Sequence, residues 1–93
     1  MKRLRLTDDM RRFISKLHPY IKKKIKNGLA AVLEDPAIGK NLKEDLAGLK
    51  SLRVEKFRII YKPEKSGTIS VIAIGPRRTI YEETLKLLRK NRV

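Results

Sequence analysis

The first residues of the chain alternate between basic and apolar side chains, and the pattern then changes to a helical period. Residues 2–6 (Lys-Arg-Leu-Arg-Leu) place every second side chain on the same face, which predicts a short strand. Thr7 is a suitable N-cap, and the acidic pair at 8–9 suits the positive end of a helix. A helix is therefore predicted from residue 8, and its apolar side chains lie at helical spacing: Met10, Phe13, Ile14 and Leu17.

A second helix is predicted directly after His18-Pro19, because proline ends the preceding helix and suits the first turn of the next. Its apolar stripe consists of Ile21, Ile25, Leu29, Val32 and Leu33. Gly28 lies inside this helix, where it costs about 1 kcal/mol relative to alanine. Asp35-Pro36 ends the helix, since the residue before a proline avoids the helical conformation.

The second half of the chain carries the alternating pattern of strands. Strands are predicted at about residues 49–54, 57–63 and 69–75, after a connector over 37–48 that Leu42 and Leu46 anchor. On the first two strands, the side chains expected to face the helices are Leu52, Val54, Phe57 and Ile59. Those expected on the other face are Ser51, Arg53, Arg58, Ile60 and Lys62. Residues 79–82 (Thr-Ile-Tyr-Glu) form a capping-box pattern that opens a last helix.

The predicted order is therefore β-α-α-β-β-β-α, an α+β fold in one domain over residues 1–93. Two N-terminal helices are expected to pack on a small, mainly antiparallel sheet, and a short C-terminal helix follows. The first strand must join the same sheet so that its backbone groups find partners.

Two arginines flank the predicted turn between the first two of these strands. If Glu55-Lys56 form a two-residue turn, Arg53 lies directly opposite Arg58, about 5 Å away on the same face. Like charges in this arrangement repel, which favours an anionic ligand over the pair. The alternative is an ordinary surface arginine paired with an acid, and for Arg53 the candidates are Glu44, Asp45 and Glu55.

Composition adds a strongly basic charge to this picture. A net charge of +14 on 93 residues indicates a nucleic acid, an acidic protein or an anionic membrane surface as partner. The absence of cysteine excludes disulfides and thiolate metal sites and fits a cytoplasmic protein. No apolar run approaches the roughly 20 residues of a membrane span, so no membrane-spanning segment is expected. Of the three kinds of partner, we do not expect the membrane. The sequence has no pattern of metal ligands and no Gly-rich phosphate loop, so neither a metal nor a cofactor is expected.

Two segments near the end of the chain carry a family resemblance: residues 52–61 (Leu-Arg-Val-Glu-Lys-Phe-Arg-Ile-Ile-Tyr) and 74–81 (Ile-Gly-Pro-Arg-Arg-Thr-Ile-Tyr). Residues 17–19 before a basic helix and residues 33–36 (Leu-Glu-Asp-Pro) extend it over most of the chain. In this order, at this length and charge, they resemble the RelE/ParE toxin superfamily of toxin–antitoxin systems. The resemblance implies a cognate antitoxin, acidic or amphipathic, that covers the basic surface.

RelE-like members of this superfamily cut mRNA in the ribosomal A site, whereas ParE-like members inhibit DNA gyrase. The RelE-like nucleases carry an arginine after the last strand and a tyrosine near the C-terminus, and Arg77 and Tyr81 match these positions. The resemblance therefore favours a ribosome-dependent, metal-independent mRNA endoribonuclease, with the ribosome and mRNA as partners. Two alternatives stay open: a non-enzymatic gyrase inhibitor, and a toxin that has lost catalysis and only binds its antitoxin.

The resemblance and the charge pattern together imply three catalytic residues. Arg58 would hold the scissile phosphate with its forked guanidinium, and Arg77 would stabilise or protonate the leaving group. Tyr81 would help to activate the 2′-hydroxyl, which requires nearby cations to lower a phenol pKa of about 10. The alternatives are a surface Arg58 paired with a carboxylate of a neighbouring element, a solvated loop in which Arg77 pairs with Glu82 or Glu83, and simple packing of Tyr81 at a helix start.

Further cations are candidates for RNA binding: Arg53, Arg78, Lys50, Lys56, Lys62, Lys22, Lys23 and Lys24. The best-known nucleases of the family carry two lysines on the first strand of the hairpin, where this chain has Leu49 and Ser51. Lys50 is one residue out of phase and belongs to the opposite face, whereas Lys56 and Lys62 are candidates to replace those lysines in space. The lysines at 22–24 would contact ribosomal RNA phosphates, with a solvated helix face as the alternative.

Overall fold

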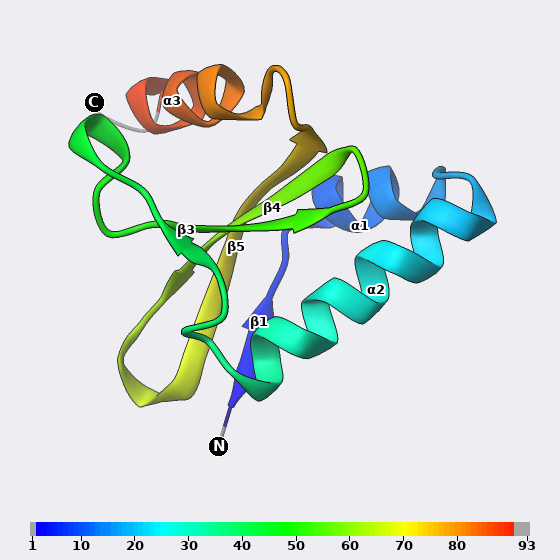
Figure 1. The fold of residues 1–93 in the computed structure, drawn as a ribbon, viewed down its shortest axis with the longest axis horizontal. Coiled ribbons are helices and arrows are strands. Elements are labelled where there is room, and N and C mark those ends of the chain that lie inside the picture. The colour runs from blue at the N-terminus through cyan, green and yellow to red at the C-terminus, as the bar shows by residue number, and fades with distance from the viewer. Residues whose placement is uncertain (1, 91–93) are drawn as a thin grey trace.

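The computed structural model describes residues 2–90 and has the predicted α+β order with one strand added (Figure 1). The elements are β1 (Arg3–Arg5), α1 (Asp8–Ser15), α2 (Pro19–Glu34), β2 (Lys40–Asn41), β3 (Lys50–Val54), β4 (Phe57–Pro63), β5 (Thr68–Pro76) and α3 (Ile80–Lys90). Two short 3₁₀ turns lie at Glu44–Leu46 and Lys65–Gly67. No helix within residues 2–90 is both long enough and apolar enough to span a bilayer.

The strands form one five-stranded sheet in the order β1-β5-β4-β3-β2. β1 pairs in parallel with β5, which confirms that the first strand joins the sheet, and the other neighbours are antiparallel. β2 was not predicted: Lys40 and Asn41 pair with Ser51 and Lys50 inside the segment expected to be a connector. Such a short pairing leaves no periodic pattern, so only the long-range contact with β3 defines it.

Local capping sets the boundaries of the first two helices. The Thr7 hydroxyl accepts a hydrogen bond from the Met10 N–H at 3.1 Å, which begins α1 as predicted. The His18 Nδ1 accepts one from the Tyr20 N–H at 3.1 Å, and Pro19 occupies the first turn of α2. α1 and α2 lie on the same face of the sheet, as Figure 1 shows.

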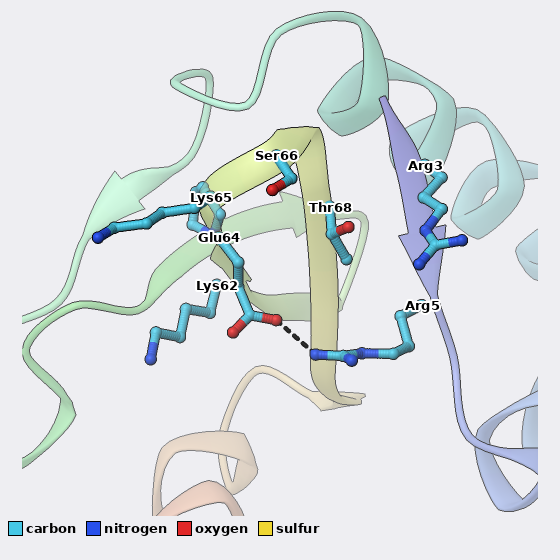
Figure 2. A pocket seen from close by; sticks show the side chains of 8 residues that line it. Arg3, Arg5, Lys62, Glu64, Lys65, Ser66 and Thr68 are labelled. Carbon is cyan, nitrogen blue, oxygen red and sulfur yellow. Dashed lines mark hydrogen bonds and ion pairs between the residues drawn. The ribbon is translucent and has the colours of Figure 1, made fainter. Parts of the chain in front are cut away.

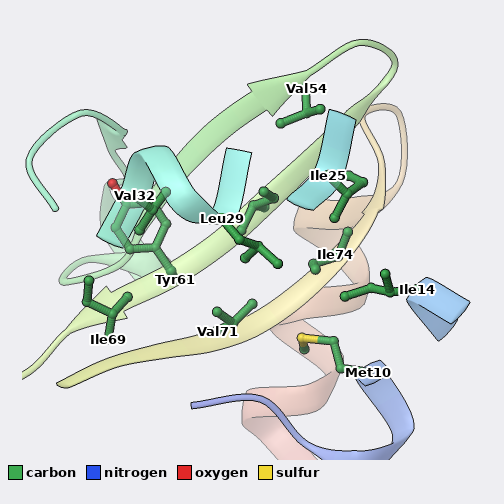
Figure 3. Close-up of a cluster of buried hydrophobic side chains, with 11 residues drawn as sticks. Met10, Ile14, Ile25, Leu29, Val32, Val54, Tyr61, Ile69, Val71 and Ile74 are labelled. Atoms are coloured by element: carbon green, nitrogen blue, oxygen red, sulfur yellow. The ribbon is translucent and has the colours of Figure 1, made fainter. Parts of the chain in front are cut away.

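The main core lies between the sheet and these two helices, on a face that we call the α1–α2 face. Its fully buried side chains include Ile25, Val32, Ile59 and Tyr61. Figure 3 shows the Tyr61 ring beneath α2, beside Val32. The Tyr61 hydroxyl donates to the Pro36 carbonyl and accepts from the Gly39 N–H, both at 2.8 Å. Burial raises the pKa of this phenol, so it stays a neutral donor.

A smaller core covers the opposite face of the sheet, which we call the α3 face. Leu49, Ile60 and Ala73 pack there against Ile80 of α3, and the predicted anchors Leu42 and Leu46 contact the same cluster. The register steps from Ile60–Ala73 to Tyr61–Val71 and leaves Ile72 as an extra residue on β5. Because the irregularity lies on β5, the alternation along β4 is kept, which confirms the predicted division of its side chains between the two faces.

Candidate functional site

The β3–β4 hairpin places two arginines opposite each other on the α3 face. Its turn is Glu55-Lys56, with Glu55 in the left-handed region at a φ of 56°, and Arg53 pairs with Arg58 as predicted. The Arg53 Nε donates to the Glu55 carbonyl at 3.3 Å. Within residues 2–90 the ion pairs are Arg5–Glu64 and Arg12–Asp9, so the carboxylate partners considered for Arg53 do not neutralise it there.

Arg58 lies half-buried at the centre of this region. Its Nη1 donates to the Ser51 Oγ at 3.1 Å, and its Cζ lies 5.9 Å from the centre of the Tyr81 ring. The Arg58 Nε is buried and has no hydrogen-bond partner in the part of the chain that the structure describes. A buried donor without an acceptor costs about 1–3 kcal/mol, and an anionic ligand that accepts from it would recover this energy.

Tyr81 joins the site from the first turn of α3. Its ring packs against the small core of the α3 face, and its hydroxyl donates to the Ser51 Oγ at 3.3 Å. Tyr81 therefore both packs at the helix start and donates a hydrogen bond into the site. Arg58 and Tyr81, 23 positions apart in the sequence, meet because β4 and α3 both pack on β5.

Ser51 connects the two, and sequence reasoning missed it as a site residue. It is only 2% exposed and accepts hydrogen bonds from both Arg58 and Tyr81. The position of Ser51 on β3 could have identified it. Ser51 lies opposite Ile60, which is two residues from Arg58 on β4. Ser51 and Arg58 are therefore diagonal neighbours on one face, and a long side chain can reach across that distance.

Arg77 and Arg78 follow the end of β5. The Arg77 N–H donates to the Lys56 carbonyl at 2.8 Å, which fastens this segment to the hairpin turn. Both arginines are exposed, and neither forms an ion pair with Glu82 or Glu83 within residues 2–90. Gly75 lies opposite Arg58, and a Cβ there would come within 2.8 Å of the Ile80 Cδ1. The glycine therefore allows α3 to begin close to the site.

The remaining candidates divide between the two faces of the sheet. Lys62 lies on the α3 face, four residues from Arg58 along β4, which is about 13 Å. Lys50 lies opposite Tyr61 on the α1–α2 face and donates to the Asn41 side chain, so the predicted phase difference is confirmed. The lysines at 22–24 belong to α2 and also lie on that face, with Lys24 5.5 Å from the centre of the Tyr20 ring.

The structure thus brings together Arg53, Arg58, Tyr81 and the backbone of Lys56 and Arg77, whereas Lys50 and the lysines of α2 lie on the other face. The roles of all these residues stay predictions. Within residues 2–90, no group of three or more His, Asp or Glu side chains is placed to bind a metal ion.

Comparison with known proteins identifies the class to which this small α+β protein belongs. The chain belongs to the family of ParE toxins of type II toxin–antitoxin systems, whose model matches residues 4–81. The predicted superfamily is confirmed, and the protein is the toxin of a toxin–antitoxin system. No curated protein matches the chain.

Solved structures of RelE toxins share the fold. The RelBE2 toxin–antitoxin complex of Mycobacterium tuberculosis contains a chain 27% identical to this one, with a TM-score of 0.68 over 80% of this chain and 95% of that chain. The isolated RelE toxin of E. coli is 22% identical, with a TM-score of 0.69 over 95% and 99% of the two chains. The intact RelBE complex of E. coli matches at 20% identity and a TM-score of 0.69, over 82% and 96%.

Proposed function

We propose that this toxin is a ribosome-dependent, metal-independent mRNA endoribonuclease. The observation that carries the proposal is the contact of Arg58, Ser51 and Tyr81 on the α3 face, with a buried Arg58 Nε that lacks an acceptor within residues 2–90. A phosphodiester supplies that acceptor. The forked guanidinium binds two phosphate oxygens at once, which fixes the orientation of the scissile group.

The chemistry requires three events at one phosphate. The 2′-oxygen loses its proton and attacks phosphorus, the bond from phosphorus to the 5′-oxygen breaks, and the leaving oxygen takes up a proton. The products are a 2′,3′-cyclic phosphate and a free 5′-hydroxyl. We assign Tyr81 to help activate the 2′-hydroxyl as the general base that takes its proton, Arg58 to stabilise charge on the phosphate, and Arg77 to stabilise or protonate the leaving oxygen.

A cognate antitoxin and the translating ribosome are the proposed partners. The charge of +14 supports both an acidic or amphipathic antitoxin and an RNA surface. The solved complexes of M. tuberculosis and E. coli contain toxins of this fold together with antitoxins.

Inhibition of DNA gyrase is the second candidate function, and the match to the ParE model favours it. A further observation points the same way: Leu49 and Ser51, at the positions of the two nuclease lysines, are both buried, at 6% and 2% exposure. The absence of the two lysines at these positions is also consistent with a toxin that only binds its antitoxin.

Substitution of the two arginines tests the nuclease. We expect Arg58→Ala and Arg77→Ala each to lower the cleavage rate by about 10²–10³-fold and to restore growth on induction, because each removes a charge-stabilising donor. Primer extension on translated mRNA with purified protein and ribosomes measures the rate. Lys86→Ala, which removes an exposed cation on α3, is the matched control and should stay toxic. If both arginine variants fold and remain fully toxic, the nuclease assignment is wrong.

The same induction separates the nuclease from the gyrase inhibitor. Mapping of mRNA 5′ ends should give cuts at fixed positions within codons for the nuclease. Intact transcripts together with a DNA-damage response would instead assign the toxin to gyrase. If induction of the native toxin leaves growth unaffected, the protein is the inactive alternative that only binds its antitoxin.

A further inference from the structure

A second cationic surface lies on the α3 face at the other end of the sheet from Arg58. It is an open depression of about 700 Å³ where β1, the end of β4 and the start of β5 meet (Figure 2). Arg3, Arg5, Lys62 and Lys65 line it, and Glu64 is the acidic residue among its described lining residues. We call this the β1 basic surface.

The alternation noted in the first residues of the chain builds this surface. Leu4 and Leu6 pack against the main core, so Arg3 and Arg5 point to the opposite face. Arg5 lies opposite Ser70 of β5, and Ser70 lies opposite Lys62 of β4, which gives one row across three strands. Figure 2 shows the Arg5 side chain reaching across β5 to Glu64.

Arg5 is held in a defined orientation in this row. Its Nε and Nη2 donate to the Ser70 Oγ at 3.2 and 2.7 Å, and its Nη2 also donates to the Glu64 carboxylate at 2.5 Å. Ser70 is 8% exposed and donates to the same carboxylate. The Arg5 Nη1 has no partner among residues 2–90, so one edge of a pre-oriented guanidinium stays free for a ligand.

The charges of the surface do not balance. The hydrogen bond from Ser70 and the nearby Arg5 and Lys62 lower the pKa of Glu64, so its carboxylate is ionised at neutral pH. It offsets one of the four cations, which leaves a net charge of +3 (+4 − 1) on the lining. Arg3, Lys62 and Lys65 form no ion pair within the part of the chain that the structure describes.

We propose that the β1 basic surface binds phosphates of an RNA backbone, as a contact separate from the Arg58 site; the choice of RNA rests on the proposed function. The lining side chains named above are polar, and an interface with an acidic protein would need buried apolar or aromatic anchors. Arginine and lysine contacts to phosphate give affinity without sequence preference and weaken with salt. The surface therefore supplies binding and docking, whereas the Arg58 site supplies chemistry.

The test measures RNA binding without cleavage. Fluorescence anisotropy follows the purified full chain on a labelled single-stranded RNA with 2′-O-methyl groups, at several salt concentrations and without ribosomes. The double variant Arg3→Gln/Lys62→Gln should reduce the slope of log K against log [salt] by about 1.4, which corresponds to two lost phosphate contacts. Glu64→Gln should tighten binding several-fold, because it removes the opposing charge.

Arg11→Gln/Lys16→Gln is the matched control, since it removes one exposed arginine and one exposed lysine from the region of α1. An equal loss in this control, or an unchanged slope in the Arg3/Lys62 variant, would overturn the proposal. The proposal would also be overturned if the Arg3/Lys62 variant lost binding to a labelled polyglutamate peptide but kept its RNA binding. That result would assign the surface to an acidic protein. The nuclease assignment is tested by cleavage on ribosomes, whereas this slope is measured without ribosomes on RNA that cannot be cleaved, so the two failures are distinguishable.

Discussion

Ser51 shows how one small residue organises the site. A serine hydroxyl can accept two hydrogen bonds while it donates one, and here it accepts from Arg58 and from Tyr81. Serine stands where related nucleases have a lysine, so the chain has a buried acceptor in place of a substrate-binding cation. Ser51 thereby holds the Arg58 and Tyr81 side chains in place, and we propose that it is a positioning residue of the site.

If the toxin is the proposed nuclease, Ser51→Ala is expected to lower the cleavage rate by about 10–100-fold, because misplacement of reacting groups by about 1 Å has effects of this size. The loss should fall on kcat rather than on KM, since Ser51 orients the site and does not hold the RNA. Single-turnover cleavage on ribosomes measures this split. Ser51→Thr keeps the hydroxyl and should recover part of the rate. A kcat for Ser51→Ala equal to that of the native toxin would contradict the positioning role.

At the scale of elements, Gly28 sets the distance between α2 and β3. A Cβ on Gly28 would lie 2.7 Å from the Val54 Cγ2 and 3.1 Å from the Ile59 Cδ1. The helix thus gives up about 1 kcal/mol of intrinsic propensity for close packing on the strand that carries Arg53. The sequence identified the cost of this glycine but not its reason.

Gly28→Ala is expected to destabilise the protein by about 0–2 kcal/mol, because overpacking costs about 1–3 kcal/mol and the gain in helix propensity offsets about 1. Val54 is β-branched and buried, so it cannot rotate away easily. Urea unfolding measures the change. The double variant Gly28→Ala/Val54→Ala should lose less stability than the sum of the single variants, and strict additivity would show that the two residues do not compete for space.

At the scale of the whole molecule, the N-terminal strand is fastened to the far end of the sheet by the Arg5–Glu64–Ser70 contacts. Arg5 and Glu64 are 59 positions apart, and their contact ties the edge strand β1 to the segment that follows β4. The same face of the sheet therefore carries two cationic surfaces, one at each end, with α3 between them. The lysines of α2 face the other way, so a single flat RNA surface cannot contact all predicted cations at once.

The Glu64 contact makes the stability of the protein depend on pH. The pKa of Glu64 is lowered in the folded state, so its carboxylate contributes stability above its unfolded pKa of about 4.3, and this contribution is lost as the pH falls through the lower folded value. Glu64→Gln should therefore lower the free energy of unfolding at pH 7, and the difference from the native chain should be lost at an acid pH below the lowered folded pKa of Glu64. Urea unfolding at both pH values measures it, with Glu34→Gln as the control. A difference that persists at acid pH would show that the charge is not its cause.

Local sequence patterns were sufficient for most of the elements. Thr7, Pro19 and Pro36 mark helix boundaries through capping and backbone restriction, which act over a few residues. The hairpin register followed from a two-residue turn, so the opposition of Arg53 and Arg58 could be predicted. The division of β3 and β4 into two faces followed from strict alternation.

The sequence by itself thus determined the order of the elements, the hairpin, the basic charge and the superfamily. Only the tertiary structure decided that β1 lies beside β5, that β2 exists, and that Ser51 joins Arg58 to Tyr81. It also decided which cations share a face, and it placed Arg3, Arg5 and Lys62 together. The reason is that turns, caps and alternation depend on neighbouring residues, whereas pairing between distant strands depends on how all elements bury their apolar faces together.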